Sequence, residues 1–226
     1  MQQFFDQIIL SDNVVKEFYN VYNSSPTFKS ELLKILPQIE DCEKQEQNNP
    51  WHKYNVLRHI LHSIEAINLL AKQLPFRERR LLAYTMLFHD IGKPACHIKR
   101  EKNGKIIDSF FNHNIESSRI AKEVAPKFGF SKEETAIIEK LVFKHDIFMF
   151  IKPYPVANKH WKELTFRLLR QEIQDLDSVG DGYHLLKLLV MVGRADSMAQ
   201  NETMTTFELH DKFDQMLEDY KYIEKE

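Results

Sequence analysis

The sequence predicts an all-α protein, and three observations lead to this fold class. Glycine and proline are sparse, with 6 Gly and 8 Pro in 226 residues. Long segments repeat apolar residues with the 3.6-residue period of helices rather than the alternation typical of strands. One stretch near residues 96–111 departs from this pattern, because Asn103-Gly104 lies between two short β-prone runs. This stretch predicts a small hairpin or an irregular loop inserted in a helical bundle.

The N-terminal part predicts several short helices. Residues 1–23 are amphipathic and rich in aromatic side chains, which favours one or two helices. Ser24-Ser25-Pro26 interrupts them, and residues 27–40 resume the helical spacing. Asp41 to Pro50 is polar. We interpret it as a connection rather than a domain boundary, since the helix that follows needs partners to cover its apolar faces.

Two long helices are expected next. Residues 51–74 keep apolar side chains at helical spacing as far as Pro75. Leu81 to Phe88 is apolar on nearly every side, which is typical of a buried central helix. This helix ends on the adjacent pair His89-Asp90, followed by the helix-stopping residues Gly92 and Pro94.

The C-terminal half is expected to be helical as well. Ser131 followed by Glu134 is a capping box and predicts the start of a helix. The remaining expected elements are a helix opened by His113 and ended by Gly129, a helix over 132–145, an ordered loop over 147–158, and helices over 161–175, 183–199 and 204–224.

We expect a single domain over residues 1–226, with its core at about 50–200 and the segments 1–48 and 204–224 packed on it. The net charge of −2 gives no standing attraction to nucleic acid or to an anionic membrane. No apolar run approaches the ~20 residues of a membrane span, and the N-terminus lacks the features of a signal peptide. Cys42 and Cys96 are far apart in the sequence and are interpreted as reduced thiols. We therefore expect a soluble, cytoplasmic protein.

Three apolar helices each carry polar residues with the chemistry of metal ligands: His59, His89-Asp90 and Asp196. His113 and His145 lie at predicted helix termini, where their side chains could turn toward the same centre. Burying a carboxylate beside an imidazole is unfavourable unless both find a partner, and a divalent cation can bind both. The alternative for one His-Asp pair is a histidine hydrogen-bonded to a capping or ion-paired aspartate.

The order His, His-Asp, His, His, Asp is the signature of the HD superfamily of metal-dependent phosphohydrolases, which this chain resembles. The segments 47–59, 88–94 and 111–113 are similar to the HD domain attached to bacterial CCA-adding tRNA nucleotidyltransferases. The resemblance covers roughly residues 30–200 and implies an HD-domain helical bundle. No nucleotidyltransferase domain precedes it, so only the chemistry of the HD part is expected.

The resemblance implies the role of each residue. His59, His89, Asp90 and Asp196 would bind one metal ion, and His113 and His145 would complete a second site that shares Asp90. A single ion, with the two histidines contacting the substrate phosphate, is the alternative. Mixed imidazole and carboxylate ligands suit Mn, Fe, Co, Ni or Zn, and Mg also stays open.

The implied activity is hydrolysis of a phosphomonoester or a cyclic phosphodiester of a nucleotide or RNA end by a metal-bound hydroxide. Asp90 and Lys93 are the candidate catalytic residues, with Lys93 stabilising charge on the phosphoryl oxygens. A solvated lysine at a helix end is the alternative for Lys93. The expected ligand is a phosphorylated small molecule, a nucleotide or an RNA end, without a membrane or an obligate protein partner. Two other functions stay open: a nucleotide- or tRNA-binding module with a structural metal, and a metal-dependent oxygenase.

Overall fold

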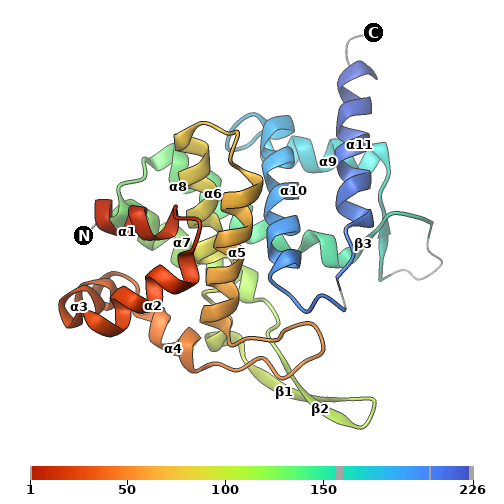
Figure 1. Cartoon of the computed structure of the whole chain (residues 1–226). Coiled ribbons are helices and arrows are strands. Elements are labelled where there is room, and N and C mark those ends of the chain that lie inside the picture. Colours follow the sequence, from red (N-terminus) through yellow and green to blue (C-terminus); the bar gives the residue numbers. More distant parts are fainter. Residues whose placement is uncertain (1, 156–159, 204, 224–226) are drawn as a thin grey trace.

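Three central helices, α5 (Val56–Leu70), α6 (Phe76–His89) and α10 (Gly182–Met198), lie side by side in the computed structural model (Figure 1). The structure describes residues 2–155, 160–203 and 205–223. Helix α6 is buried at every position from Leu81 to His89, which confirms the predicted central helix. The fold is all-α with small sheets, as predicted.

The N-terminal helices cover one side of α5 (Figure 1). They are α1 (Gln2–Ile9), α2 (Val14–Ser24), α3 (Pro26–Ile35) and α4 (Gln38–Lys44). The single stretch of helical spacing over 27–40 is two helices, because Pro37 lacks a backbone donor and disfavours a helical conformation at Leu36. The connection predicted from Asp41 is also shorter, since α4 continues to Lys44.

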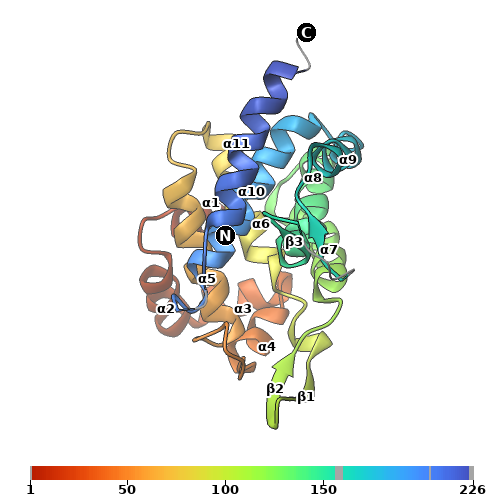
Figure 2. The same ribbon diagram turned by 90° about the vertical axis from the view of Figure 1, so that its right-hand side faces the viewer.

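The other side of the bundle holds α7 (His113–Val124), α8 (Lys132–Lys144), α9 (Phe166–Leu176) and α11 (Glu208–Ile223). Figure 2 shows α11 running across α10. Short 3₁₀ helices are η1 (Pro94–Cys96), η2 (Ala125–Phe128) and η3 (His145–Phe150). No helix in the described ranges is long and apolar enough to cross a membrane.

The predicted hairpin is present as the antiparallel strands β1 (Ile98–Lys102) and β2 (Lys105–Ser109). Its turn residues Asn103 and Gly104 have φ of 53° and 74°, which Asn and Gly tolerate best. A second small sheet pairs β3 (Ile151–Lys152) in parallel with β4 (Lys162–Glu163).

Three helices begin later than predicted: α11 begins at Glu208 rather than at 204, and in α5 and α9 a capping side chain sets the first turn. Helix α5 begins at Val56 rather than at 51, because the Asn55 side chain accepts a hydrogen bond from the N–H of Arg58. Helix α9 begins at Phe166 rather than at 161, because strand β4 comes first and Thr165 forms the cap. The expected loop over 147–158 contains β3, and its residues 156–158 lie outside the described part of the chain.

Candidate metal centre

Six side chains from distant parts of the chain meet in the interior. The ligand atoms of His59, His89, Asp90 and Asp196 all lie within 4.8 Å of one another. Those of Asp90, His113 and His145 form a second group within the same limit. The structure therefore brings together every metal-ligand candidate that the sequence indicated.

The first group joins α5, the end of α6 and α10. His59 Nε2 lies 3.1 Å from Asp90 Oδ2 and 2.9 Å from Asp196 Oδ1. His89 Nε2 lies 3.3 Å and 3.5 Å from the same two oxygen atoms. The two Nε2 atoms are themselves 3.3 Å apart. Two imidazoles and two carboxylates thus face one point.

The second group shares Asp90 with the first. Asp90 Oδ1 lies 3.1 Å from His113 Nε2 and 3.7 Å from His145 Nε2, and these two nitrogen atoms are 3.2 Å apart. Because Oδ2 of Asp90 faces the first group and Oδ1 the second, this carboxylate stands between them. It is in position to bridge two ions.

The chain's own hydrogen bonds orient the histidines. Each Nδ1 faces a backbone carbonyl oxygen, which can only accept, so Nδ1 carries a proton and Nε2 points to the centre as the available ligand atom. The distances are 2.7 Å for His89 to Met86, 2.8 Å for His113 to Phe110, 2.6 Å for His145 to Val142 and 3.4 Å for His59 to Ala199. Nε2 atoms that face each other in a buried site repel unless a cation lies between them, either a proton taken up by one imidazole or a metal ion bound by both. This donor set therefore fits a divalent metal ion.

The electrostatics of the buried centre also favour positive charge. Burial opposes an imidazolium, but the Asp90 and Asp196 carboxylates outweigh it and raise the pKa of His89 to about 10. Burial likewise opposes a charged Asp90, yet Lys93 and His89 hold the pKa of this carboxyl well below its usual range. The site keeps its carboxylates ionised and attracts cations.

Local backbone features place the second group beside the first. Gly92 follows the end of α6, and its N–H donates to Ser117 Oγ of α7 at 2.9 Å. A Cβ at Gly92 would lie 2.6 Å from the Ser117 backbone nitrogen, so only glycine permits this approach. Asn112 adopts the left-handed conformation with φ of 62° immediately before α7 and thereby sets the direction of His113.

Lys93 is buried rather than solvated, with 5% of its surface exposed. Its Nζ lies 2.6 Å from Asp90 Oδ2, donates to Gln47 Oε1 at 2.9 Å and lies 3.2 Å from His52 Nε2. Burial and Lys93 lower the pKa of His52 well below its usual value, so this ring is neutral. It donates through Nδ1 to Asn49 and accepts from Lys93 through Nε2. The segment predicted only as a polar connection therefore belongs to the site.

Asp146 is a site residue that the sequence reasoning missed. Its Oδ2 lies 3.3 Å from His113 Nε2, and its Oδ1 lies 3.3 Å from His145 Nε2. Burial disfavours a charged His145, but the neighbouring Asp146 carboxylate raises the pKa of this imidazole. The signal was a second His-Asp dipeptide at the end of a helix, His145-Asp146, which repeats the pattern of His89-Asp90.

Residues 56–179 match the HD domain family. Curated relatives include bifunctional uridylyltransferase/uridylyl-removing enzymes of Ruegeria pomeroyi (31% identical over 129 residues) and Cereibacter sphaeroides (30% over 127 residues). A protein of the same description from Erythrobacter litoralis is 27% identical over 125 residues.

Each match covers 50% of this chain but only 12% of the relative, so the chain matches about an eighth of those proteins. The expected superfamily is confirmed. These relatives are not CCA-adding enzymes, so they do not support the narrower resemblance that the motifs suggested.

Proposed function

The chain belongs to the HD domain family, and from this premise we propose that it is a metal-dependent phosphohydrolase. We propose as its substrate a phosphomonoester or a cyclic phosphodiester of a nucleotide or an RNA end. The observation that carries the proposal is the convergence of four inward-facing Nε2 atoms on two carboxylates, the buried Asp90 and the partly buried Asp196. A divalent ion held there would supply a Lewis acid for phosphoryl oxygens and a water that loses its proton near neutral pH.

The residues of the chain prepare the site for this chemistry. Backbone carbonyl groups hold the imidazoles in the tautomer that leaves Nε2 free. Lys93 pairs with Asp90 and keeps this carboxylate charged and oriented between the two ligand groups. Burial of His89 and Asp90 excludes bulk water from the inner side of the centre, which strengthens the electrostatic interactions there.

The relatives give independent support for phosphoester cleavage. They are described as uridylyl-removing enzymes, and removal of a uridylyl group breaks a phosphoester of a nucleotide. The part of each relative that matches this chain is its HD region. We infer that the ligand of this chain is also a phosphorylated small molecule, a nucleotide or an RNA end.

The test measures metal content and turnover together. The purified chain is loaded separately with Mn, Fe, Co, Ni, Zn or Mg and assayed on bis(p-nitrophenyl) phosphate, 5′-mononucleotides and 2′,3′-cyclic mononucleotides. Asp90→Asn is expected to lose both the bound metal and at least 100-fold in turnover, an order of magnitude typical for a group that stabilises the transition state. Asp12→Asn is the matched control, since the Asp12 side chain is 77% exposed and belongs to neither group of ligands.

Unchanged turnover in Asp90→Asn would contradict the proposal. Retained metal and tight binding of a mononucleotide without turnover for any ester would instead support the binding module. Consumption of O₂ by the iron-loaded chain with a non-phosphorylated substrate would identify an oxygenase.

A further inference from the structure

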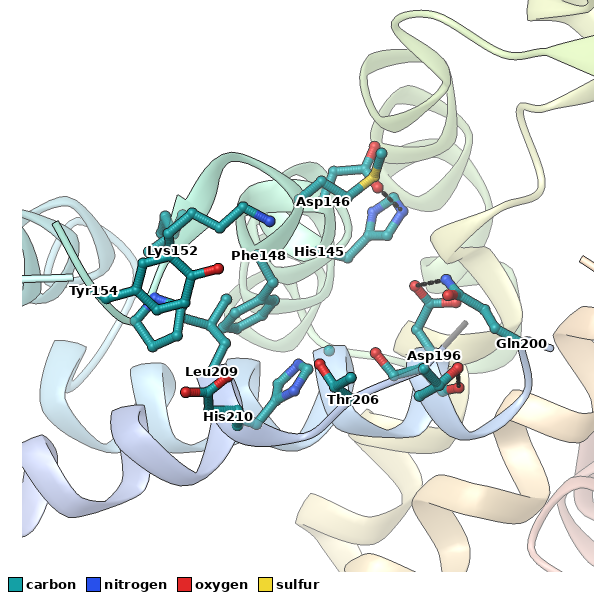
Figure 3. Close-up of a pocket in the computed structure, with 17 residues that line it drawn as sticks. His145, Asp146, Phe148, Lys152, Tyr154, Asp196, Gln200, Thr206, Leu209 and His210 are labelled. Carbon is teal, nitrogen blue, oxygen red and sulfur yellow. Dashed lines mark hydrogen bonds and ion pairs between the residues drawn. The ribbon is translucent and has the colours of Figure 1, made fainter. Parts of the chain in front are cut away.

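A cavity of about 220 Å³ opens directly beside the candidate metal centre. It shares His145, Asp146 and Asp196 with the centre, and its far wall comes from the segment 205–210 at the start of α11. Figure 3 shows His145 and Asp146 on one side of the cavity and His210 on the wall formed by α11. If the phosphoryl group of a substrate lies at the metal centre, the group esterified to that phosphate would therefore extend into this cavity.

His210 is the unusual residue of the cavity wall. It is 4% exposed, and neither ring nitrogen has a hydrogen-bond partner among the described residues. Its ring packs against Phe148 with 4.9 Å between the centroids. A buried donor or acceptor without a partner costs about 1–3 kcal/mol, so its presence in a folded protein calls for an explanation.

The protonation state of His210 indicates what could pair with it. Burial and the nearby Arg194 lower the pKa of His210 to about 4. The neutral ring offers one donor and one acceptor. Hydroxyl groups of a sugar and the amide-like edge of a nucleobase present the complementary acceptor and donor.

The charge of the cavity argues against a second anionic group. The carboxylates Asp146, Asp196 and Glu208 line it, and Lys152 is the single lysine or arginine among the described lining residues. Phe148 and Tyr154 add aromatic surface. The cavity therefore suits a neutral, flat group of limited size, while the phosphate stays with the metal centre.

Phe148 packs against the imidazole of His210 in the wall of the cavity. This ring is only partly buried and lies so close to α10 that a Cβ at Gly193 would be 2.4 Å from it. The same Cβ would lie 3.0 Å from His210 Nε2, so the ring nitrogen and Phe148 share this narrow space. A rotation of Phe148 toward the open side would uncover the unpaired nitrogen.

We propose that this cavity binds the neutral nucleoside part of the substrate and that His210 pairs with a polar group of its base or sugar. This inference rests on the proposed function and narrows it to nucleoside monophosphate esters, including cyclic ones, over nucleoside di- and triphosphates. His210 lies outside residues 56–179 that match the family, so the selectivity would belong to the C-terminal segment of this chain.

The first test is binding of a nucleoside without phosphate. Uridine and adenosine are titrated into the full chain by calorimetry, with and without Mn²⁺. At least one is expected to bind, and His210→Phe is expected to weaken that binding at least 10-fold, whereas His210→Gln, which keeps a donor and an acceptor, retains most of it. His184→Phe is the control, because the His184 side chain is 43% exposed and does not line the cavity. Thr206→Trp, at an exposed lining position, provides a second variant that fills the cavity without disturbing the core.

The second test is selectivity in turnover. The ratio of kcat/KM for a mononucleotide to kcat/KM for p-nitrophenyl phosphate should fall at least 10-fold in His210→Phe and in Thr206→Trp. Three results would overturn the cavity assignment without contradicting the proposed hydrolysis. They are equal nucleoside binding in all variants, no nucleoside binding by the original chain, and a preference for nucleoside triphosphates as substrates. Absence of turnover with every metal, together with nucleoside binding that depends on His210, would overturn the proposed hydrolysis and leave the cavity assignment intact.

Discussion

Lys93 Nζ lies 2.6 Å from Asp90 Oδ2, and both side chains are almost completely buried. The pair places the Lys93 Nζ against the carboxylate that stands between the two groups of metal ligands. The sequence predicted that Lys93 stabilises charge on the phosphoryl oxygens of a substrate. In the structure its shortest contact is with the Asp90 carboxylate. This geometry makes Lys93 a positioning residue for Asp90, and its contact with substrate stays a prediction.

Lys93→Met is expected to destabilise the metal-free protein by about 3–5 kcal/mol, because it leaves a buried carboxylate without its partner. A bound divalent ion supplies positive charge at the same place, so saturation with Mn²⁺ should recover most of this loss. Urea unfolding with and without the metal measures both values. Lys99→Met, at an exposed position of the hairpin, should change stability by less than about 0.5 kcal/mol. Equal destabilisation of Lys93→Met in both conditions would show that Lys93 acts independently of the metal-binding carboxylate.

Gly92→Ala is expected to separate the two ligand groups. The new Cβ would lie 2.6 Å from the backbone nitrogen of Ser117, which cannot rotate away, so α7 and with it His113 must shift. We expect a loss of about 1–3 kcal/mol in stability and a lower metal content. In the control Gly180→Ala, the nearest atom is the flexible Leu185 Cδ1 at 3.1 Å, and a small effect is expected. Retention of full stability and metal content by Gly92→Ala would show that this close approach is not required.

The sequence predicted the fold class and the metal-ligand candidates because these depend on local patterns. The all-apolar stretch before His89 indicated a buried helix, and the imidazoles and carboxylates carried by such apolar helices indicated metal ligands. The structure brings all six predicted ligands together. Their roles as ligands remain predictions that metal analysis must test.

What the sequence did not predict depends on contacts between distant segments. Gln47 was interpreted as part of a polar connection, but it is 4% exposed and accepts a hydrogen bond from Lys93. His210 lies in the segment 204–224, for which only a helix was predicted, but it forms part of the wall of the cavity. A polar side chain gives no local signal of burial when a distant segment covers it. Gln47 and Lys93, for example, are 46 residues apart in the sequence. Such residues are found only from the packed structure.

Asp146→Asn is expected to lower the metal content of the second ligand group. The change removes one negative charge that lies 3.3 Å from both His113 and His145, while side-chain size is conserved. We expect the number of bound Mn²⁺ ions per chain, measured by elemental analysis after dialysis, to fall from two toward one. Asp12→Asn should keep the original value. A single ion in the original chain, or two ions in Asp146→Asn, would exclude this role for Asp146.

His210 should make the stability of the metal-free protein depend on pH below neutrality. The pKa of His210 is about 4 in the folded protein, whereas a histidine in the unfolded chain titrates near 6.5. Between these values the unfolded chain binds a proton that the folded protein does not, so stability is full above pH ~6.5 and falls as the pH is lowered toward ~4. The loss attributable to this residue should approach about 3 kcal/mol. Urea unfolding of the chelator-treated protein at several pH values, compared with His210→Phe, isolates the contribution, because the variant cannot take up this proton. The original protein should lose more stability than the variant over this range, and parallel curves for the two proteins would mean that folding does not lower the pKa of His210.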